Sequence, residues 1–260
     1  MKNALILGIL LFFLAGCLSA GQSTNSISSS GKKTLKVGVS TNSPPMIYKE
    51  GSEIVGLEAD FAEGLARSMG RKLQFVQIKW EDQIPSLLSG KTDIIMSGMT
   101  ITEARSYRIA FCAPYLLSGQ IPLVRRTDKY KYEYGLTDLF NPALKIGTIT
   151  GTTGDKLIQE TRANGQRIQF AKSDQAAKAV INKELDALVY DLPGNMYLSA
   201  IYADQGLTAV NVLMSREEIA WGVRPGDTEM LNAANGYLQL LNQNKKLLQM
   251  IQRWIPAYRR

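Results

Sequence analysis

Residues 93–105 read DIIMSGMTITEAR, and this stretch decides the kind of fold and places a candidate binding site. The apolar run from Ile94 to Met96 predicts a short buried strand. Ser97 and Gly98 predict a turn after that strand, and Thr102 predicts the N-terminal cap of a helix. A strand that runs directly into a helix leaves backbone amides exposed at the junction, and such amides favour an anion.

Two side chains support this interpretation of the junction. The Thr100 hydroxyl and the Arg105 guanidinium both follow the predicted turn closely in sequence, and a guanidinium can hold a carboxylate with two parallel hydrogen bonds. The stretch therefore predicts an anion site. A capped helix that carries an ordinary surface arginine is the alternative, and this stretch alone leaves it open.

The strand-then-helix pattern recurs on both sides of this stretch. Leu57, Phe61, Leu65 and Met69 stand four residues apart, which predicts one amphipathic helix. Strands are predicted at 35–39, 73–78, 93–96, 143–148, 168–170 and 187–190, helices at 56–69, 155–164 and 173–182, and a strand followed mostly by helix at 221–258. Two consecutive α/β units of this kind predict parallel sheets with helices on both faces.

Small and polar residues gather where the predicted strands end. In open α/β sheets, ligands bind beyond the carboxyl ends of the strands. Five loops occupy such positions, at 40–43, 80, 97–105, 150–154 and 190–191. The first loop continues into Pro44 and Pro45, which are expected to block regular strand pairing. Together the five loops predict a ligand cleft between two lobes.

The N-terminal residues predict export across a membrane. Lys2 and the apolar run 4–13 are followed by Leu14-Ala15-Gly16-Cys17, which resembles the bacterial lipoprotein cleavage box. Residues 1–16 are thus predicted to be a signal peptide, Cys17 the lipidated residue, and the serine-rich segment 17–32 a flexible tether. The predicted location is the periplasmic or cell-surface side of a membrane, held by a lipid anchor. An ordinary secretory signal with an incidental cysteine is the alternative.

The composition excludes several classes of function. The chain has no histidine, which excludes Ser-His-Asp and Cys-His catalysis and histidine-ligated metals, and no metal or cofactor is expected. The net charge is +7, but the basic residues are scattered and do not alternate with aromatic residues, so no nucleic-acid groove is expected. Besides Cys17, the only cysteine is Cys112, predicted to be a small buried residue without an internal disulfide.

Five motifs occur in an order that is typical of one family. They are residues 55–60 (VGLEAD), 97–102 (SGMTIT) with Arg105, 111–115 (FCAPY), 151–154 (GTTG) and 191–193 (DLP). The chain from about 33 to 254 resembles the amino-acid-binding receptors of bacterial ABC importers, solute-binding protein family 3, which include glutamine-, histidine- and lysine/arginine/ornithine-binding proteins.

This resemblance implies a fold and a set of partners. The fold is the type II periplasmic-binding-protein fold, in which two α/β lobes are joined by a two-strand hinge. Lobe I is expected at 33–116 and 218–260, lobe II at 120–215, and the hinge at 117–119 and 216–217. The expected partners are an amino acid and an ABC-transporter permease in the inner membrane, and the receptor is expected to be a monomer.

The resemblance also implies roles for single residues. The counterpart of Arg105 pairs with the ligand α-carboxylate, to which the amides matching Thr100 and Thr153 also donate. The carboxylate matching Asp191, the Gly98 carbonyl and the Thr100 hydroxyl hold the α-ammonium. Trp80 matches an aromatic residue that packs on the ligand side chain. A solvated carboxylate at a strand end and a core tryptophan are the alternatives for Asp191 and Trp80.

The remaining predicted ligand-binding residues suggest a neutral side-chain pocket. Ser40 stands where receptors for basic amino acids carry an acid, Ser43 where many carry a large aromatic residue, and Ile149 where a polar residue is frequent. The set is completed by Ser97, Met99 and Tyr190. A neutral amino acid, polar or aromatic, is therefore expected, because a buried Lys or Arg head without a countercharge is costly. A basic amino-acid receptor stays open, although Glu58 and Glu81 are both expected to face solvent at helix starts.

A second class of function is an enzyme on the same scaffold, because the family contains cyclohexadienyl dehydratases. Those enzymes need a general acid a few residues beyond the position of Asp191. Here residues 192–195 read LPGN, which offers neither an acid nor a base, and no histidine is available. A receptor without catalytic activity is therefore predicted.

Overall fold

The structure is a computed structural model that describes residues 33–161, 165–256 and 258. The predicted signal peptide, the tether and Cys17 lie outside these residues. No helix among the described residues is both long enough and apolar enough to cross a membrane.

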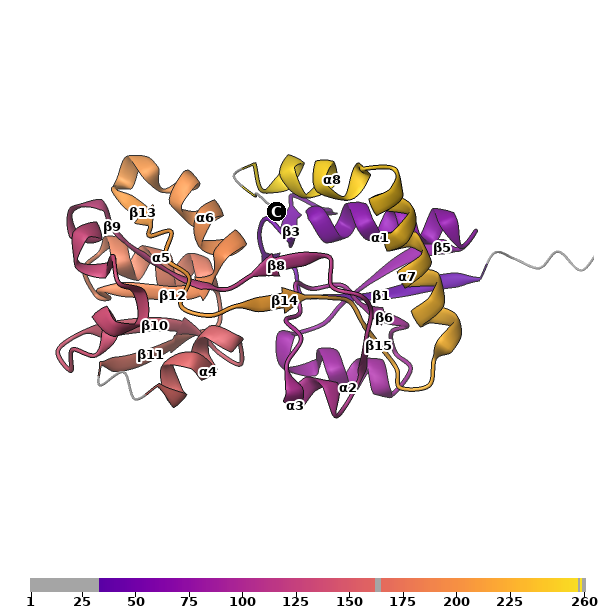
Figure 1. The fold of residues 1–260 in the computed structure, drawn as a ribbon, viewed down its shortest axis with the longest axis horizontal. Helices are drawn as coiled ribbons and strands as arrows, with labels where there is room; N and C mark the ends of the chain where they lie inside the picture. Colours follow the sequence, from indigo (N-terminus) through magenta and orange to yellow (C-terminus); the bar gives the residue numbers. More distant parts are fainter. Residues whose placement is uncertain (1–32, 162–164, 257, 259–260) are drawn as a thin grey trace, which may run out of the picture. The chain divides into compact units, whose positions relative to one another are not determined.

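The first of two five-stranded sheets is built around the strand predicted at 93–96 (Figure 1). Its order is β5 (Lys72–Gln77), β1 (Thr34–Val39), β6 (Ile94–Ile95), β15 (Gly222–Val223) and β7 (Ala110–Phe111). The three strands predicted from the N-terminal α/β unit are parallel, as expected. β15 runs antiparallel to both of its neighbours, so the expectation of a purely parallel sheet is wrong for this strand.

The second sheet repeats this arrangement. Its order is β11 (Gln166–Phe170), β10 (Lys145–Ile149), β12 (Ala187–Asp191), β9 (Gln120–Arg125) and β13 (Leu207–Ala209). The three predicted strands are again parallel, whereas β9 is antiparallel to β12 and to β13. Antiparallel neighbours need no helical crossover, and for this reason β9 is not part of a βαβ repeat in the sequence.

Each central strand is buried on both faces. In β6 and the turn after it, Ile94 and Met96 pack in the cluster that contains residues of α1, α7 and α8, whereas Ile95 packs against α2. Figure 1 shows α1 and α8 on one side of this sheet and α2 on the other. The helices around it are α1 (Leu57–Ser68), α2 (Gln83–Leu88), α3 (Glu103–Ser106), α7 (Thr228–Gln243) and α8 (Lys246–Trp254). Strands covered on both faces read as continuous apolar runs, which explains the sequence signal.

The second sheet shows the same alternation. Leu188 and Tyr190 of β12 pack in one cluster with residues of α5 and α6, whereas Ala187 and Val189 pack in another that includes Ile158 of α4. Its helices are α4 (Thr153–Glu160), α5 (Ser173–Ile181) and α6 (Leu192–Ile201). The described chain also contains short 3-10 helices: η1 (Trp80–Asp82), η2 (Arg126–Tyr132), η3 (Gly135–Leu139) and η4 (Ala203–Gln205).

Two further small sheets connect to these elements. β8 (Leu116–Ser118) and β14 (Glu217–Ile219) form an antiparallel pair where the chain passes from one sheet to the other, and they overlap the predicted hinge segments. The hinge and the lobe boundaries themselves stay predictions. β2 (Asn42–Ser43), β3 (Ile47–Glu50) and β4 (Glu53–Val55) form a small sheet. The expected block of strand pairing is therefore wrong for 42–43, because the prolines lie in the turn beyond them.

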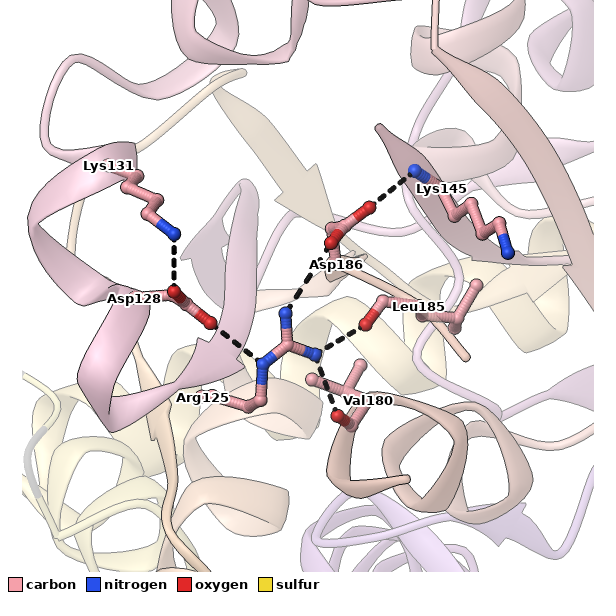
Figure 2. Close-up of polar contacts among 7 residues, drawn as sticks. All are labelled: Arg125, Asp128, Lys131, Lys145, Val180, Leu185 and Asp186. Carbon is pink, nitrogen blue, oxygen red and sulfur yellow. Dashed lines mark hydrogen bonds and ion pairs between the residues drawn. The ribbon is translucent and has the colours of Figure 1, made fainter. Parts of the chain in front are cut away.

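Arg125 joins several segments of the second sheet (Figure 2). Its Nη1 donates to the carbonyls of Val180 (2.9 Å) and Leu185 (2.6 Å), and its Nε donates to Asp128 Oδ2 (2.7 Å). Its Nη2 lies 3.4 Å from Asp186 Oδ1, and Asp186 Oδ2 accepts from the amide of Lys145 (2.8 Å). The guanidinium therefore adds a second donor to the Val180 carbonyl in the last turn of α5, which also accepts from the Lys183 amide (3.2 Å).

Candidate functional site

A cavity of about 880 Å³ lies among the loops at the carboxyl ends of the predicted strands. All twelve residues predicted to contact a ligand line it: Ser40, Ser43, Trp80, Ser97, Gly98, Met99, Thr100, Arg105, Ile149, Thr153, Tyr190 and Asp191. Its volume lies within the range of about 300–1,000 Å³ that is usual for small-molecule pockets. The structure therefore brings these residues together, while their roles toward a ligand stay predictions.

Arg105 brings a positive charge to the cavity wall. Thr102 caps α3 by accepting a hydrogen bond from the Arg105 amide (3.2 Å), as predicted from the sequence. The Arg105 side chain donates through Nη1 to the Thr100 carbonyl (2.8 Å), and its guanidinium carbon lies 5.1 Å from the centroid of the Trp80 ring. Burial lowers the pKa of Arg105, and the Asp191 and Glu217 carboxylates oppose that shift. An arginine stays charged under such conditions.

The N-terminus of α4 adds donors from the second sheet. Thr152 caps this helix by accepting from the Asp155 amide, so Thr153 is its first residue. Gly151 adopts a φ of 74°, which favours glycine, and its carbonyl accepts from Trp80 Nε1 at 2.9 Å. Trp80 is half-buried: it lines the cavity and also packs against the apolar cluster that contains Leu87 and Ile95.

Another part of the cavity wall carries a carboxylate. Asp191 ends β12, where it pairs with Gln120 of β9, and the Gln120 amide donates to Asp191 Oδ1 at 2.5 Å. Burial raises the pKa of Asp191 to about 7, and Glu217 adds to this, whereas Gln120 and Arg105 oppose it. Asp191 is therefore a poorly solvated carboxylate that a cationic group would stabilise.

Glu217 and Gln120 join this part of the site, and sequence analysis assigned neither of them a role. The Glu217 carboxylate accepts from the hydroxyls of Thr100 (2.9 Å) and Thr153 (2.8 Å), which come from the loops of the two different sheets. Glu217 begins β14, and its neighbour Glu218 is exposed. The alternation of a strand that ends in the buried Ile219 is the sequence signal that places position 217 on the inner side.

Glu58 corrects an expectation from the sequence. It is buried beneath the turn at 97–98 and does not face solvent: its carboxylate accepts from the Gly98 amide and from the Tyr115 hydroxyl. Burial raises its pKa to about 7, while those two hydrogen bonds oppose the shift. Glu58 is the second residue of α1, and Gly56 before it has a φ of 125°. A Cβ at Gly56 would lie 2.4 Å from the Met46 carbonyl oxygen, so the tight entry into α1 requires glycine.

The buried residues in the rest of the cavity wall carry no charge. Ser40 and Ile149 are buried, and the Ser40 amide donates to Ser97 Oγ at 2.7 Å. Tyr190 is buried as well, with its hydroxyl 3.5 Å from Ser43 Oγ. Exposed charged residues also line the cavity, namely Lys79, Glu81, Arg108 and Lys172. Glu81 is thus exposed, as expected.

The described residues hold no group of three or more histidine, cysteine, aspartate or glutamate side chains suited to a metal ion. Cys112 is buried, as the sequence predicted, and it has no disulfide partner among the described residues. Burial raises the pKa of this thiol to about 12, so the thiol stays protonated and unreactive.

Comparison with known proteins gives one family. A probable histidine-binding protein of Campylobacter jejuni is 30% identical over 209 residues, which cover 80% of this chain and 74% of that protein. The arginine-binding extracellular protein ArtP of Bacillus subtilis is 26% identical over 261 residues, or 95% of this chain and 98% of ArtP. Cyclohexadienyl dehydratase of Pseudomonas aeruginosa is more distant, at 22% identity over 222 residues, or 85% of this chain and 82% of the enzyme.

Solved structures agree with this relationship. An ancestral arginine-binding protein bound to arginine matches with a TM-score of 0.79 and 27% identity, covering 86% of this chain and 98% of the other. The two-lobed α/β fold expected from the sequence is thereby confirmed. The model of the family described as bacterial extracellular solute-binding proteins, family 3, matches residues 35–257. The chain therefore belongs to the bacterial extracellular solute-binding proteins of family 3.

Proposed function

We propose that this protein is an extracytoplasmic receptor that binds one free amino acid in the 880 Å³ cavity and delivers it to an ABC importer. The observation that carries the proposal is that a cation and a carboxylate line the same cavity. Arg105 is bonded to the Thr100 carbonyl, and Asp191 lies beside it in a wall that also contains the Thr100 hydroxyl. An α-amino acid carries a carboxylate and an ammonium on one carbon atom, and these two groups match the two side-chain charges.

The ligand side chain would extend along Trp80 and Tyr190 toward Ser40, Ser43 and Ile149. A neutral side chain, polar or aromatic, could stack on Trp80 and reach the hydroxyls without leaving a buried charge unpaired. Ser40→Asp should then shift preference toward lysine or arginine, because it supplies a countercharge in the depth of the cavity.

A basic amino acid is the second candidate. Glu81 lines the cavity at its exposed rim, and relatives named for binding histidine and arginine support this candidate. A long cationic side chain could reach Glu81 while its stem packs on Trp80. Competition among glutamine, phenylalanine, histidine, lysine and arginine separates the two candidates.

We further propose that the protein is not an enzyme. The segment after Asp191 has no acid or base, and its polar residue, Asn195, is fully buried. Asn195 donates to the carbonyls of Ile121 (2.7 Å) and Leu188 (3.1 Å), so it holds the fold and does not reach the cavity. A dehydratase assay with prephenate or arogenate should therefore give no product.

The export and anchoring proposals rest on the sequence. Cleavage before Cys17 and acylation of Cys17 would hold a monomeric receptor at the periplasmic or cell-surface side, with residues 17–32 as tether. Cys17→Ser should release the protein from the membrane fraction. Intact-mass analysis of membrane-extracted protein checks the modification, and an unmodified Cys17 would contradict the proposal.

Calorimetric titration against the twenty amino acids tests the proposed function. The protein is first unfolded and refolded so that any ligand carried through purification is lost. Saturable binding of at least one amino acid, lost in Arg105→Ala, is the expected result. If the refolded protein has its native fold and binds none of the twenty amino acids, the proposed function is refuted. Small-angle scattering with the ligand that binds then tests whether two lobes, 33–116 with 218–260 and 120–215, close about a hinge.

A further inference from the structure

The Glu217 carboxylate is the meeting point of side chains from four segments of the chain. Thr100 follows β6, Thr153 begins α4, Gln120 begins β9, and Ser215 precedes β14. Glu217 Oε2 accepts from Thr100 Oγ1 (2.9 Å) and Thr153 Oγ1 (2.8 Å), and Oε1 accepts from Ser215 Oγ (2.7 Å) and Gln120 Nε2 (3.1 Å). Glu217 is not itself among the residues that line the cavity.

These contacts fix the polarity of the Thr100 hydroxyl. A hydroxyl has a single hydrogen to donate and two lone pairs that accept. Because Thr100 gives its hydrogen to Glu217, the same oxygen can only accept from a group in the cavity. Thr100 lines the cavity, and it is therefore held as an acceptor for a donor such as an ammonium.

Gln120 extends the same polarity to Asp191. Its Nε2 lies within hydrogen-bond distance of Glu217 Oε1, Thr153 Oγ1 (3.1 Å) and Asp191 Oδ1 (2.5 Å), so its two hydrogens are shared among these three acceptors. The Gln120 side chain is fully buried and lies between two carboxylates. The hydrogens of Gln120 and Thr100 are thus taken by groups of the protein, and Thr100 and Asp191 offer acceptors to the cavity.

We infer that Glu217 is the positioning residue that makes this part of the cavity selective for an α-ammonium, by holding the Thr100 hydroxyl as an acceptor. This inference rests on the proposed function and deepens it: the ligand must carry an ammonium beside its carboxylate. Deaminated analogues, which keep the carboxylate and the side chain, are rejected because they offer no donor to Thr100 and Asp191.

Glu217→Gln tests the inference, since it keeps the side-chain shape. An amide oxygen accepts fewer hydrogen bonds than a carboxylate, so the Thr100 hydroxyl becomes free to donate into the cavity. Affinity for the amino acid should fall about tenfold, the usual scale for a hydrogen bond to a charged group. Affinity for the deamino acid should change much less. The ratio of the affinity for the amino acid to the affinity for its deamino acid should therefore fall. Glu218→Gln is the matched control, because Glu218 is the adjacent, exposed residue on the same strand, and its ratio should equal that of the wild type.

The assay is calorimetric titration of the full chain with matched pairs. Each amino acid that binds the wild type is compared with its own deamino acid: phenylalanine with 3-phenylpropionate, glutamine with glutaramate, arginine with 5-guanidinopentanoate. Thr100→Val removes the acceptor itself and should lower this affinity ratio by a similar factor. The double variant Glu217→Gln/Thr100→Val should lower the ratio no further, since both changes remove the same interaction.

The outcomes separate this inference from the proposed function. A wild type that binds none of the twenty amino acids refutes both. A wild type that binds an amino acid, with a Glu217→Gln variant that loses equal affinity for both members of the pair, overturns the inference alone. Unchanged discrimination in a folded Glu217→Gln variant, or additive effects in the double variant, overturns it as well.

Discussion

Protonation of Asp191 should control ligand affinity. Burial and the neighbouring Glu217 raise the pKa of this carboxyl to about 7, and the proposed ammonium contact requires the ionised form. Binding therefore competes with one proton. Affinity should be constant well above the pKa and should weaken tenfold for each pH unit well below it, which gives a loss of about 50-fold between pH 7 and pH 5.

Two measurements check this expectation for an amino acid that binds, such as glutamine. Titrations from about pH 5 to pH 8.5 should give a slope of one in the logarithm of Kd below pH 7. Repeating them at about pH 6 in two buffers with different ionisation enthalpies should show close to one proton released for each ligand bound. Asp191→Asn should bind weakly even at high pH, and it should lose the proton release that belongs to this residue.

The groups around Asp191 define what else could contribute. Glu217 and Gln120 face it from β14 and β9, and Arg105 lines the same cavity. Glu58 also has a pKa of about 7, and it lies beneath the turn at Gly98. Its protonation would add to the slope in the wild type and would persist in Asp191→Asn. A pH-independent Kd and no proton release in the wild type would refute the reasoning.

Three further changes have defined outcomes. Arg105→Ala should weaken amino-acid binding by about 2–5 kcal/mol, because a desolvated charged contact is lost, and titration of a variant with an unchanged melting temperature checks this. The folded pKa of Glu58, about 7, lies above its ordinary 4.5, so the folded state holds this proton more tightly and stability falls as pH rises between those values. Glu58→Gln should remove the part of this loss of stability that belongs to Glu58. Thermal unfolding at about pH 5 and pH 8 measures it, and an unchanged loss of stability in the variant would contradict the prediction. Arg125→Ala should cost on the order of 3 kcal/mol of unfolding free energy, because it removes the guanidinium that donates to the carbonyls of Val180 and Leu185 and pairs with Asp186, whereas Asp128 keeps Lys131. Arg126→Ala, at the exposed neighbour, should cost less than about 1 kcal/mol in the same denaturant titration.

Local sequence determined the strands and the loops that line the cavity. The run Ile94–Met96 had to be buried on both faces, and a parallel α/β arrangement provides that environment. Once the strands were parallel, their carboxyl ends had to meet on one side, and so the loops at 97–105, 150–154 and 190–191 came together. The cap at Thr102 and the glycine at 98 are equally local, since a hydroxyl and a positive φ are needed at those points.

Arg105 and Asp191 were predicted from the sequence, but only the tertiary structure showed that two glutamates support the site. Glu58 and Glu217 are ordinary in sequence, because a glutamate at a helix start or on a short strand is usually solvated. Glu58 becomes buried because the entry into α1 directs it under the turn at Gly98. Glu217 becomes the acceptor for Thr100 and Thr153 because two distant loops converge on the crossing strand. Contacts of such long separation carry no local periodicity, and for that reason the polarity of the cavity wall can be derived only from the folded chain.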